Sequence, residues 1–156
     1  MKKVTFDELD DTDRELIQSA IQAMDGAYAP YSEFAVGAAV LTKNGKIYKG
    51  ANLENAVYGL GICAEVTAFA AANTAERPTG ALEVQKIAVI GGPMHDPRSS
   101  MKIVSPCGRC RQVIFEAAQS NNVDIKIFSC SGDLSTILES TIGDMLPYAF
   151  GAATLV

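Results

Sequence analysis

The sequence predicts an α/β fold in which a mixed β-sheet lies between two layers of helices, a three-layer α-β-α sandwich. Helix-like and strand-like segments alternate along the chain, and Asn44-Gly45 joins two early strand-like runs as a hairpin turn would. The 156 residues, 48% of them apolar, are enough for a sizeable core. We therefore expect a single domain over 1–156, in which 1–27 form an N-terminal segment with an amphipathic helix.

The first elements are a helix and a pair of strands. Apolar residues fall on one stripe over 12–25, which predicts a helix, and Thr12 and Glu15 have capping-box spacing at its start. Strands are expected at 34–43 and 46–53, because the Asn-Gly dipeptide between them tolerates positive φ. The chain therefore begins with a helix followed by an antiparallel hairpin.

Two longer helices and further strands make up the remainder. The Ala-rich segment 62–75 predicts a largely buried helix, and Pro106 opens another helix over 107–120. The shorter elements follow in chain order: strands at 84–90 and 124–130, a strand-like run to about 139, and a short helix over 141–146. Each longer helix follows a strand or a loop, so their positive N-terminal ends can lie side by side.

Charge and hydropathy limit the class of partner. The net charge is −5, from 13 basic and 18 acidic residues, and the chain lacks a basic run. Binding to nucleic acid requires a basic surface, so we expect a small, uncharged or cationic substrate and no nucleic acid. The acidic N-terminus has no apolar signal-peptide region, and no apolar run is long enough to span a bilayer. A cytoplasmic protein without a membrane partner is expected.

Two short motifs predict a metal centre. Cys63-Ala64-Glu65 is followed, after a long interval, by a Cys-x-x-Cys pair formed by Cys107 and Cys110. Three thiolates hold zinc and leave one coordination position for water, whose pKa the metal lowers until it becomes a nucleophile. The pattern is typical of zinc nucleobase deaminases, in which a Glu at the position of Glu65 acts as general acid and base. We expect one Zn²⁺ in each subunit.

Other interpretations of these residues are less economical. Cys107 and Cys110 could form a redox dithiol, but that would not explain a Glu two residues after a third Cys. Glu65 could instead have a structural role, because a negative charge at the start of a helix interacts favourably with the positive end of the helix dipole. Cys130 is expected to fill core space; its alternative is a fourth zinc ligand that would close the site. The only histidine, His95, lies in a Gly/Pro-rich loop and is expected at the solvated surface.

Around these motifs the chain resembles the small homotetrameric cytidine deaminases. The resemblance extends over most of the chain from Tyr28 to Gly151 and implies a mixed five-stranded sheet. It also implies hydrolysis of cytidine or deoxycytidine to uridine or deoxyuridine, with release of ammonia. Four segments carry it: APYSEFAVGAAV at 29–40, GANLENAVYGLGICAE at 50–65, SPCGRCRQVI at 105–114 and LPYAFG at 146–151.

The resemblance implies roles for several residues in substrate binding. Phe34 would stack near the pyrimidine, and an aromatic face suits a planar base. Asn52 and Glu54 would hydrogen-bond the ribose hydroxyls, as an amide and a carboxylate can. Ala64 would present its backbone to the pyrimidine edge. Tyr58 would lie at a subunit interface near the site.

Two more roles follow from the resemblance. Phe150 would close the pocket of a neighbouring subunit, so that sites are shared within the homotetramer. Gln112 would support the metal ligands. Phe34 and Phe150 could instead be core aromatics.

The chain departs from the family beside the metal motif. The family commonly has Arg directly after the Glu, where its charge offsets the −1 left by three thiolates and Zn²⁺. Here that position is Val66, and an arginine, Arg109, stands inside the Cys-x-x-Cys pair. We expect Arg109 to supply the missing charge compensation; the alternative is a side chain that points into solvent.

The same departure leaves the substrate open. An apolar residue after the Glu, together with the CGRCRQV sequence, also resembles the blasticidin S deaminases, and Gly61 could widen the mouth of the pocket. The intact NLEN segment favours cytidine. Blasticidin S, N4-modified or other cytosine nucleosides are the alternative substrates, and a non-enzymatic zinc module with Cys130 as fourth ligand is the alternative class of function.

Overall fold

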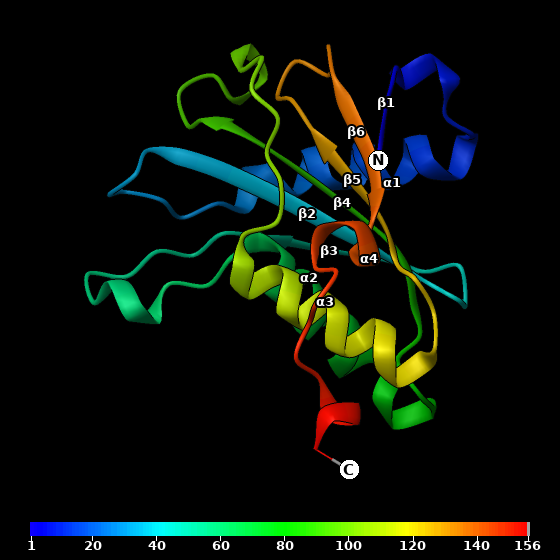
Figure 1. Cartoon of the computed structure of the whole chain (residues 1–156). Helices are drawn as coiled ribbons and strands as arrows, with labels where there is room; N and C mark the ends of the chain where they lie inside the picture. The colour runs from blue at the N-terminus through cyan, green and yellow to red at the C-terminus, as the bar shows by residue number, and fades with distance from the viewer. Residues whose placement is uncertain (156) are drawn as a thin grey trace.

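One six-stranded sheet forms the middle layer of the protein (Figure 1). The computed structural model describes residues 1–155. The strands lie in the order β1-β6-β5-β4-β2-β3, and neighbours are antiparallel except for the parallel pair β4 and β5. The strands are β1 (Lys2–Val4), β2 (Phe34–Thr42), β3 (Ile47–Ala51), β4 (Val84–Pro93), β5 (Lys126–Cys130) and β6 (Ile137–Thr141).

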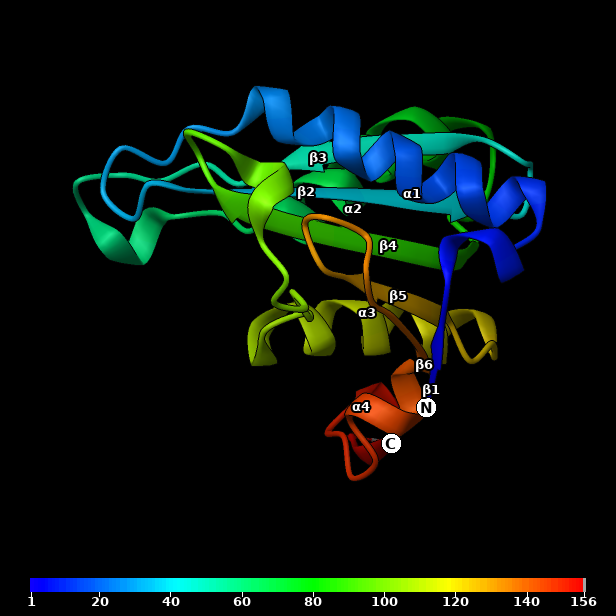
Figure 2. The same ribbon diagram turned by 90° about the horizontal axis from the view of Figure 1, so that it is seen from above.

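Helices cover both faces of this sheet, as the sequence predicts. Helix α1 (Asp11–Ala23) lies on one face, while α2 (Ala64–Glu76) and α3 (Gly108–Asn121) lie on the other (Figure 2). A short α4 (Ile142–Met145) follows β6. Alternate strand residues face the two helical layers and give two apolar cores, one on each side. Within residues 1–155, no helix is both long and apolar enough to cross a bilayer.

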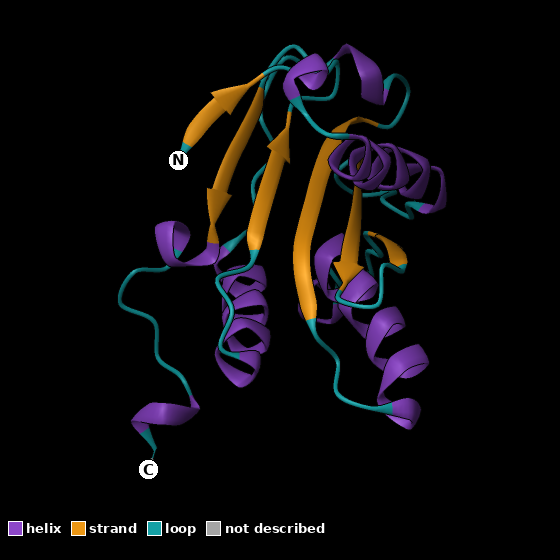
Figure 3. Cartoon of the chain, turned by 90° about the vertical axis from the view of Figure 1, so that its right-hand side faces the viewer, coloured by secondary structure: helices purple, strands orange, loops and turns teal. Residues whose placement is uncertain are grey.

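The N-terminal region differs from the prediction in two details. The sheet has six strands rather than five, because Lys2–Val4 pairs antiparallel with β6 at the sheet edge, where the chain begins (Figure 3). Helix α1 begins one residue earlier than expected and is capped by Asp10, whose side chain accepts from the Asp13 backbone N–H at 2.8 Å. The capping box at Thr12 is therefore wrong: Asp10 already satisfies the free N–H groups of the first turn.

The hairpin and the packing of α2 place the site. Gly45, with φ 74°, makes the predicted turn between β2 and β3. Gly50 of β3 faces α2 so closely that a Cβ there would collide with the backbone of Ala64 and Ala68. This glycine allows the first turn of α2 to lie against the sheet. Helix α3 connects the parallel strands β4 and β5 on the same face, so α2 and α3 begin near each other.

Candidate active site

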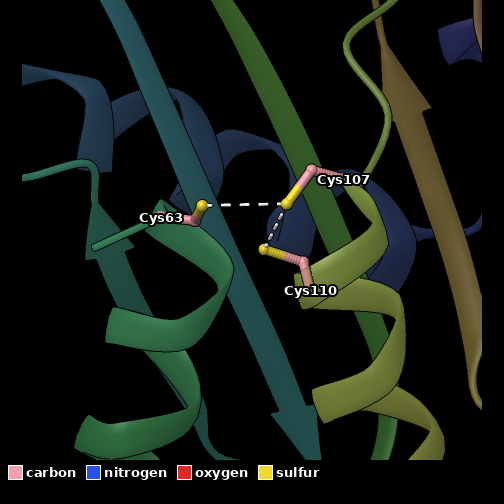
Figure 4. Close-up of side chains that lie close together, drawn as sticks. All are labelled: Cys63, Cys107 and Cys110. Carbon is pink, nitrogen blue, oxygen red and sulfur yellow. Dashed lines mark hydrogen bonds between the residues drawn. The ribbon is translucent and has the colours of Figure 1, made fainter. Parts of the chain in front are cut away.

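Three thiols meet where α2 and α3 begin (Figure 4). Cys63 precedes α2, Cys107 precedes α3, and Cys110 lies in the first turn of α3. The Sγ atoms of Cys63 and Cys107 are 3.9 Å apart, those of Cys107 and Cys110 are 3.5 Å apart, and all three lie within 4.8 Å of one another. Two sulfurs on one tetrahedral zinc are about 3.8 Å apart. The donor set therefore fits a single zinc ion.

Local backbone geometry favours charge on these sulfurs. Cys63 and Cys107 occupy N-cap positions, where the first N–H groups of a helix point toward the side chain. Burial opposes ionisation of Cys107, but hydrogen bonds from the Cys110 and Arg109 backbone hold the pKa of its thiol below the ordinary value. Burial raises the pKa of the Cys63 and Cys110 thiols. A bound cation would supply the charge that keeps these two thiols ionised.

Two remaining residues lie away from the thiol cluster. Cys130 is fully buried and packs in the core on the α1 face of the sheet, among residues such as Leu16 and Phe128. The cluster lies on the opposite face, so Cys130 fills core space and the four-ligand alternative is wrong. His95 is exposed in the loop after β4, as expected.

Glu65 lies beside the thiols at the second position of α2. Its side chain is almost fully buried, with 5% exposed, and it lines the same cavity as Cys63 and Cys107. Burial raises the pKa of this carboxyl above its ordinary value. A carboxyl group in a shielded position next to an open metal position can exchange protons with a molecule bound there.

The cavity that contains Glu65 measures about 480 Å³. Five residues expected to bind substrate line it: Phe34, Asn52, Glu54, Tyr58 and Ala64. Sequence reasoning missed several others: Ser32, Val36, Leu53, Ile62, Val104 and Ser105. Val36 could have been found, because it follows Phe34 by two residues in a strand and so shares its face. The volume and the largely apolar wall suit a small planar ligand.

Two polar residues of the cavity are already engaged with the backbone. The Glu54 carboxylate accepts at Oε2 from the N–H groups of Tyr31 (2.9 Å) and Ser32 (3.2 Å). Hydrogen bonds from the Ser32 side chain and the Tyr31 backbone lower the pKa of Glu54. Asn52 bonds to strand β2 through both its amide oxygen and its amide nitrogen. The Glu54 carboxylate is thus held in the wall of the cavity by the backbone of Tyr31 and Ser32.

Three other expected site residues lie outside the lining of this cavity in the part of the chain that the structure describes. The exposed Arg109 donates from Nη1 to the carbonyl of Gly61 at 3.2 Å. Gln112 donates from Nε2 to the carbonyl of Phe150 at 2.7 Å, which ties the C-terminal segment to α3. Phe150 itself is 61% exposed. The hydrogen bond of Gln112 thus goes to the C-terminal segment and not to a thiol.

A family model connects this site with known proteins. The model described as "Cytidine and deoxycytidylate deaminase zinc-binding region" matches residues 10–125, which include all three clustered thiols and Glu65. The chain belongs to this family. As a member of the cytidine deaminase family, it has a zinc-binding domain in which Cys63, Cys107 and Cys110 form the group able to hold the metal ion.

Individual deaminases of the family match along most of their length. A cytidine deaminase from Halalkalibacterium halodurans is 43% identical over 139 residues, covering 88% of this chain and 92% of that protein. The crystal structure of cytidine deaminase from Burkholderia pseudomallei superposes with a TM-score of 0.72 at 39% identity, covering 87% and 97% of the two chains. A blasticidin-S deaminase from Bacillus cereus is 29% identical over 139 residues, covering 88% and 91%.

Proposed function

We propose that this protein is a zinc-dependent deaminase that converts cytidine or deoxycytidine to uridine or deoxyuridine. Water supplies the oxygen that replaces the C4 amine, and ammonia leaves. The observation that carries the proposal is the meeting of three thiols and the buried Glu65 in one cavity with Phe34. The family match and the relatives at 39% to 43% identity support it.

The side chains divide the reaction between them. Zinc held by Cys63, Cys107 and Cys110 would supply a Lewis acid that lowers the pKa of water toward neutrality. Glu65 takes one proton from the attacking water and delivers it to the ring nitrogen N3; it then takes the remaining proton from the same oxygen and delivers it to the amine, which leaves as ammonia. The nearly buried position of Glu65 keeps bulk water from competing for these protons.

Substrate contacts follow from the lining of the cavity. Phe34 places an aromatic face against the pyrimidine, and the Ala64 backbone lies at the N-terminus of α2, where it can meet the base edge. The Glu54 carboxylate accepts a hydrogen bond from a sugar hydroxyl. The roles expected for Asn52 and Glu54 in binding the sugar remain predictions.

We also propose a cytoplasmic homotetramer with sites shared between subunits. The turn at Tyr58–Leu60 lies away from the sheet, at the far left of Figure 1, and Tyr58 is 79% exposed. Such exposed apolar side chains favour burial against a partner. Phe150, exposed on the C-terminal segment, is expected to close a neighbouring subunit's cavity.

Replacing Arg109 by Ala tests charge compensation at the metal. We expect the zinc affinity to fall about 10- to 100-fold, because the three thiolates lose a nearby cation and Gly61 loses its hydrogen bond. Arg109→Lys, which keeps the charge, should recover most of the loss. Affinity is measured by competition with a chromophoric chelator, and Arg98→Ala serves as control because Arg98 is exposed in a different loop. Equal affinities of the Arg109→Ala variant and the parent protein would refute this role.

A larger cytosine nucleoside is the second candidate substrate. A further cavity of about 350 Å³ adjoins the first, and the two share Ser32, Glu54, Tyr58 and Gly61. It extends the site beyond Glu54 between Tyr31 and Tyr58, whose rings lie edge to face at 5.8 Å. An acidic, aromatic space of this kind suits a cationic substituent on the sugar. The blasticidin-S deaminase relative adds support.

Direct competition separates the two substrates. Zinc-loaded protein is given cytidine, deoxycytidine, an N4-substituted cytidine and blasticidin S, alone and in pairs, and loss of the cytosine chromophore is followed by ultraviolet absorbance. We expect kcat/KM to be highest for cytidine or deoxycytidine. A higher kcat/KM for blasticidin S or the N4-substituted nucleoside would show that cytidine is not the preferred substrate, while the proposed deamination mechanism would still hold.

A further inference from the structure

Two of the three clustered thiols belong to one helical turn, and the third belongs to a different helix (Figure 4). Cys107 is the N-cap of α3, and Cys110 is the third residue of that helix. Side chains at these two positions reach each other across the first turn, as they do in a capping box. Their Sγ atoms are 3.5 Å apart. Rotation of the two side chains can therefore bring the sulfurs to the length of a disulfide bond, about 2.0 Å.

A disulfide that includes Cys63 would be harder to form. The Sγ atom of Cys63 is 3.9 Å from that of Cys107, and a bond between them would have to draw the starts of α2 and α3 together. Helix α2 is packed directly on β3, where a Cβ added to Gly50 would collide with the helix backbone. Movement of its start would disturb that contact. The geometry therefore favours a disulfide within α3.

The two thiols of α3 differ in accessibility. Cys107 is exposed and lines the cavity of about 480 Å³, whereas Cys110 is fully buried. A small oxidant that enters the cavity therefore meets Cys107 first, with the second thiol of the same turn next to it. An accessible thiol with a second thiol beside it is the arrangement found in redox-sensing cysteines.

We infer that Cys107 and Cys110 form an oxidative modification site, at which a peroxide converts the dithiol to a disulfide and thereby empties the metal site. The sulfur of Cys107 attacks one oxygen of hydrogen peroxide, the O–O bond breaks, and the products are a sulfenic acid and water. The sulfur of Cys110 then attacks the sulfur of Cys107 and forms the disulfide. The hydroxyl group leaves with the proton of the second thiol as another water. The two thiols lose two electrons, and the peroxide gains them.

The disulfide would remove two of the three metal ligands. Cys63 alone gives zinc too few protein ligands for tight binding. Oxidation would therefore stop the proposed deamination through loss of the ion, with Glu65 unchanged. A dithiol reductant restores both thiols by exchange. The inference rests on the zinc site of the proposed function, but the disulfide and the zinc can both be measured without any deamination.

Peptide mapping and zinc release test the inference together. The zinc-loaded protein is treated with hydrogen peroxide, free zinc is followed with a chromophoric chelator, and the remaining thiols are alkylated. Trypsin then cuts after Lys102, Arg109 and Arg111. Cys107 and Cys110 thus fall on separate short peptides, and a disulfide between them is identified by its mass. We expect this cross-linked pair, one zinc ion released for each disulfide formed, and recovery of zinc binding after treatment with dithiothreitol.

Three variants separate the roles of the thiols. Cys63→Ala loses the metal but keeps the dithiol, so peroxide should still form the same disulfide. Cys110→Ala lacks the second thiol, so oxidation should stop at a sulfenic acid on Cys107, which dimedone traps. Cys130→Ala loses a buried thiol on the other face of the sheet and should respond to peroxide as the parent protein does. Thermal melting followed by circular dichroism verifies that each variant is folded.

The possible results are distinguishable. A disulfide that includes Cys63, or zinc release without a cross-link between Cys107 and Cys110, would overturn the inference while leaving the proposed function intact. Thiols that stay reduced in the peroxide-treated protein would overturn it equally. Failure of the untreated zinc-loaded protein to deaminate cytidine would instead refute the proposed function, and the mapped disulfide would still stand.

Discussion

Replacing Glu65 by Gln is expected to reduce turnover of cytidine by about 100- to 10,000-fold, the range that a general acid and base contributes. Gln has nearly the same shape, so the buried position at the start of α2 stays filled. It cannot take a proton from water or return one to N3 and the amine. Bound zinc, measured by elemental analysis, should remain at one ion per chain, because the three thiols are unchanged.

Glu76→Gln is the matched control for this variant. Glu76 is the last residue of α2 and is also nearly buried, with 4% exposed. It accepts hydrogen bonds from Thr42 (2.9 Å), Asn44 (2.9 Å) and Tyr48 (3.2 Å), which hold the helix to the hairpin. We expect this variant to lower the melting temperature and leave kcat/KM of the folded protein unchanged. Parent-like turnover by Glu65→Gln would show that Glu65 is not the proton carrier.

Replacing Cys63 by Ala is expected to remove both the metal and the activity. Two remaining thiols give zinc too few protein ligands for tight binding, and the proposed reaction needs that ion to activate water. After dialysis against a weak chelator, zinc content should be close to zero and deamination undetectable. Cys107→Ala should behave in the same way, because its sulfur lies between the other two in the cluster.

Cys130→Ala is the control for these variants. It also removes a buried thiol, but on the α1 face of the sheet. We expect one zinc per chain, unchanged kcat/KM and a loss of about 1 kcal/mol of stability from the small cavity. Loss of zinc from Cys130→Ala would contradict a site with three ligands and would support the alternative in which Cys130 is a fourth zinc ligand.

Most of the layered fold could be predicted from the sequence, because it depends on local signals. The Asn44-Gly45 turn and the Ala-rich helix that follows Cys63 each follow from a few neighbouring residues. The strand at Lys2–Val4 could not be found, because three partly exposed residues carry too little hydrophobic pattern. Their pairing depends on the distant β6.

The candidate site, like the fold, could be predicted from the sequence only in part. The spacing of the Cys and Glu residues predicts the metal cluster, because ligands at helix starts are positioned by short segments. The bonds of Asn52 to β2 and of Arg109 to Gly61 could not be predicted, because each joins segments far apart in sequence. They depend on strand register and on how two helices pack, which no local pattern specifies.

The central claim is hydrolytic deamination of a cytosine nucleoside at the site formed by the three thiols and Glu65. Its most direct test is mass spectrometry of the product formed when zinc-loaded protein acts on cytidine in water enriched in oxygen-18. We predict uridine that carries one heavy oxygen, with one ammonia released for each uridine formed. Cytidine recovered unchanged, or uridine without the heavy oxygen, would contradict the account.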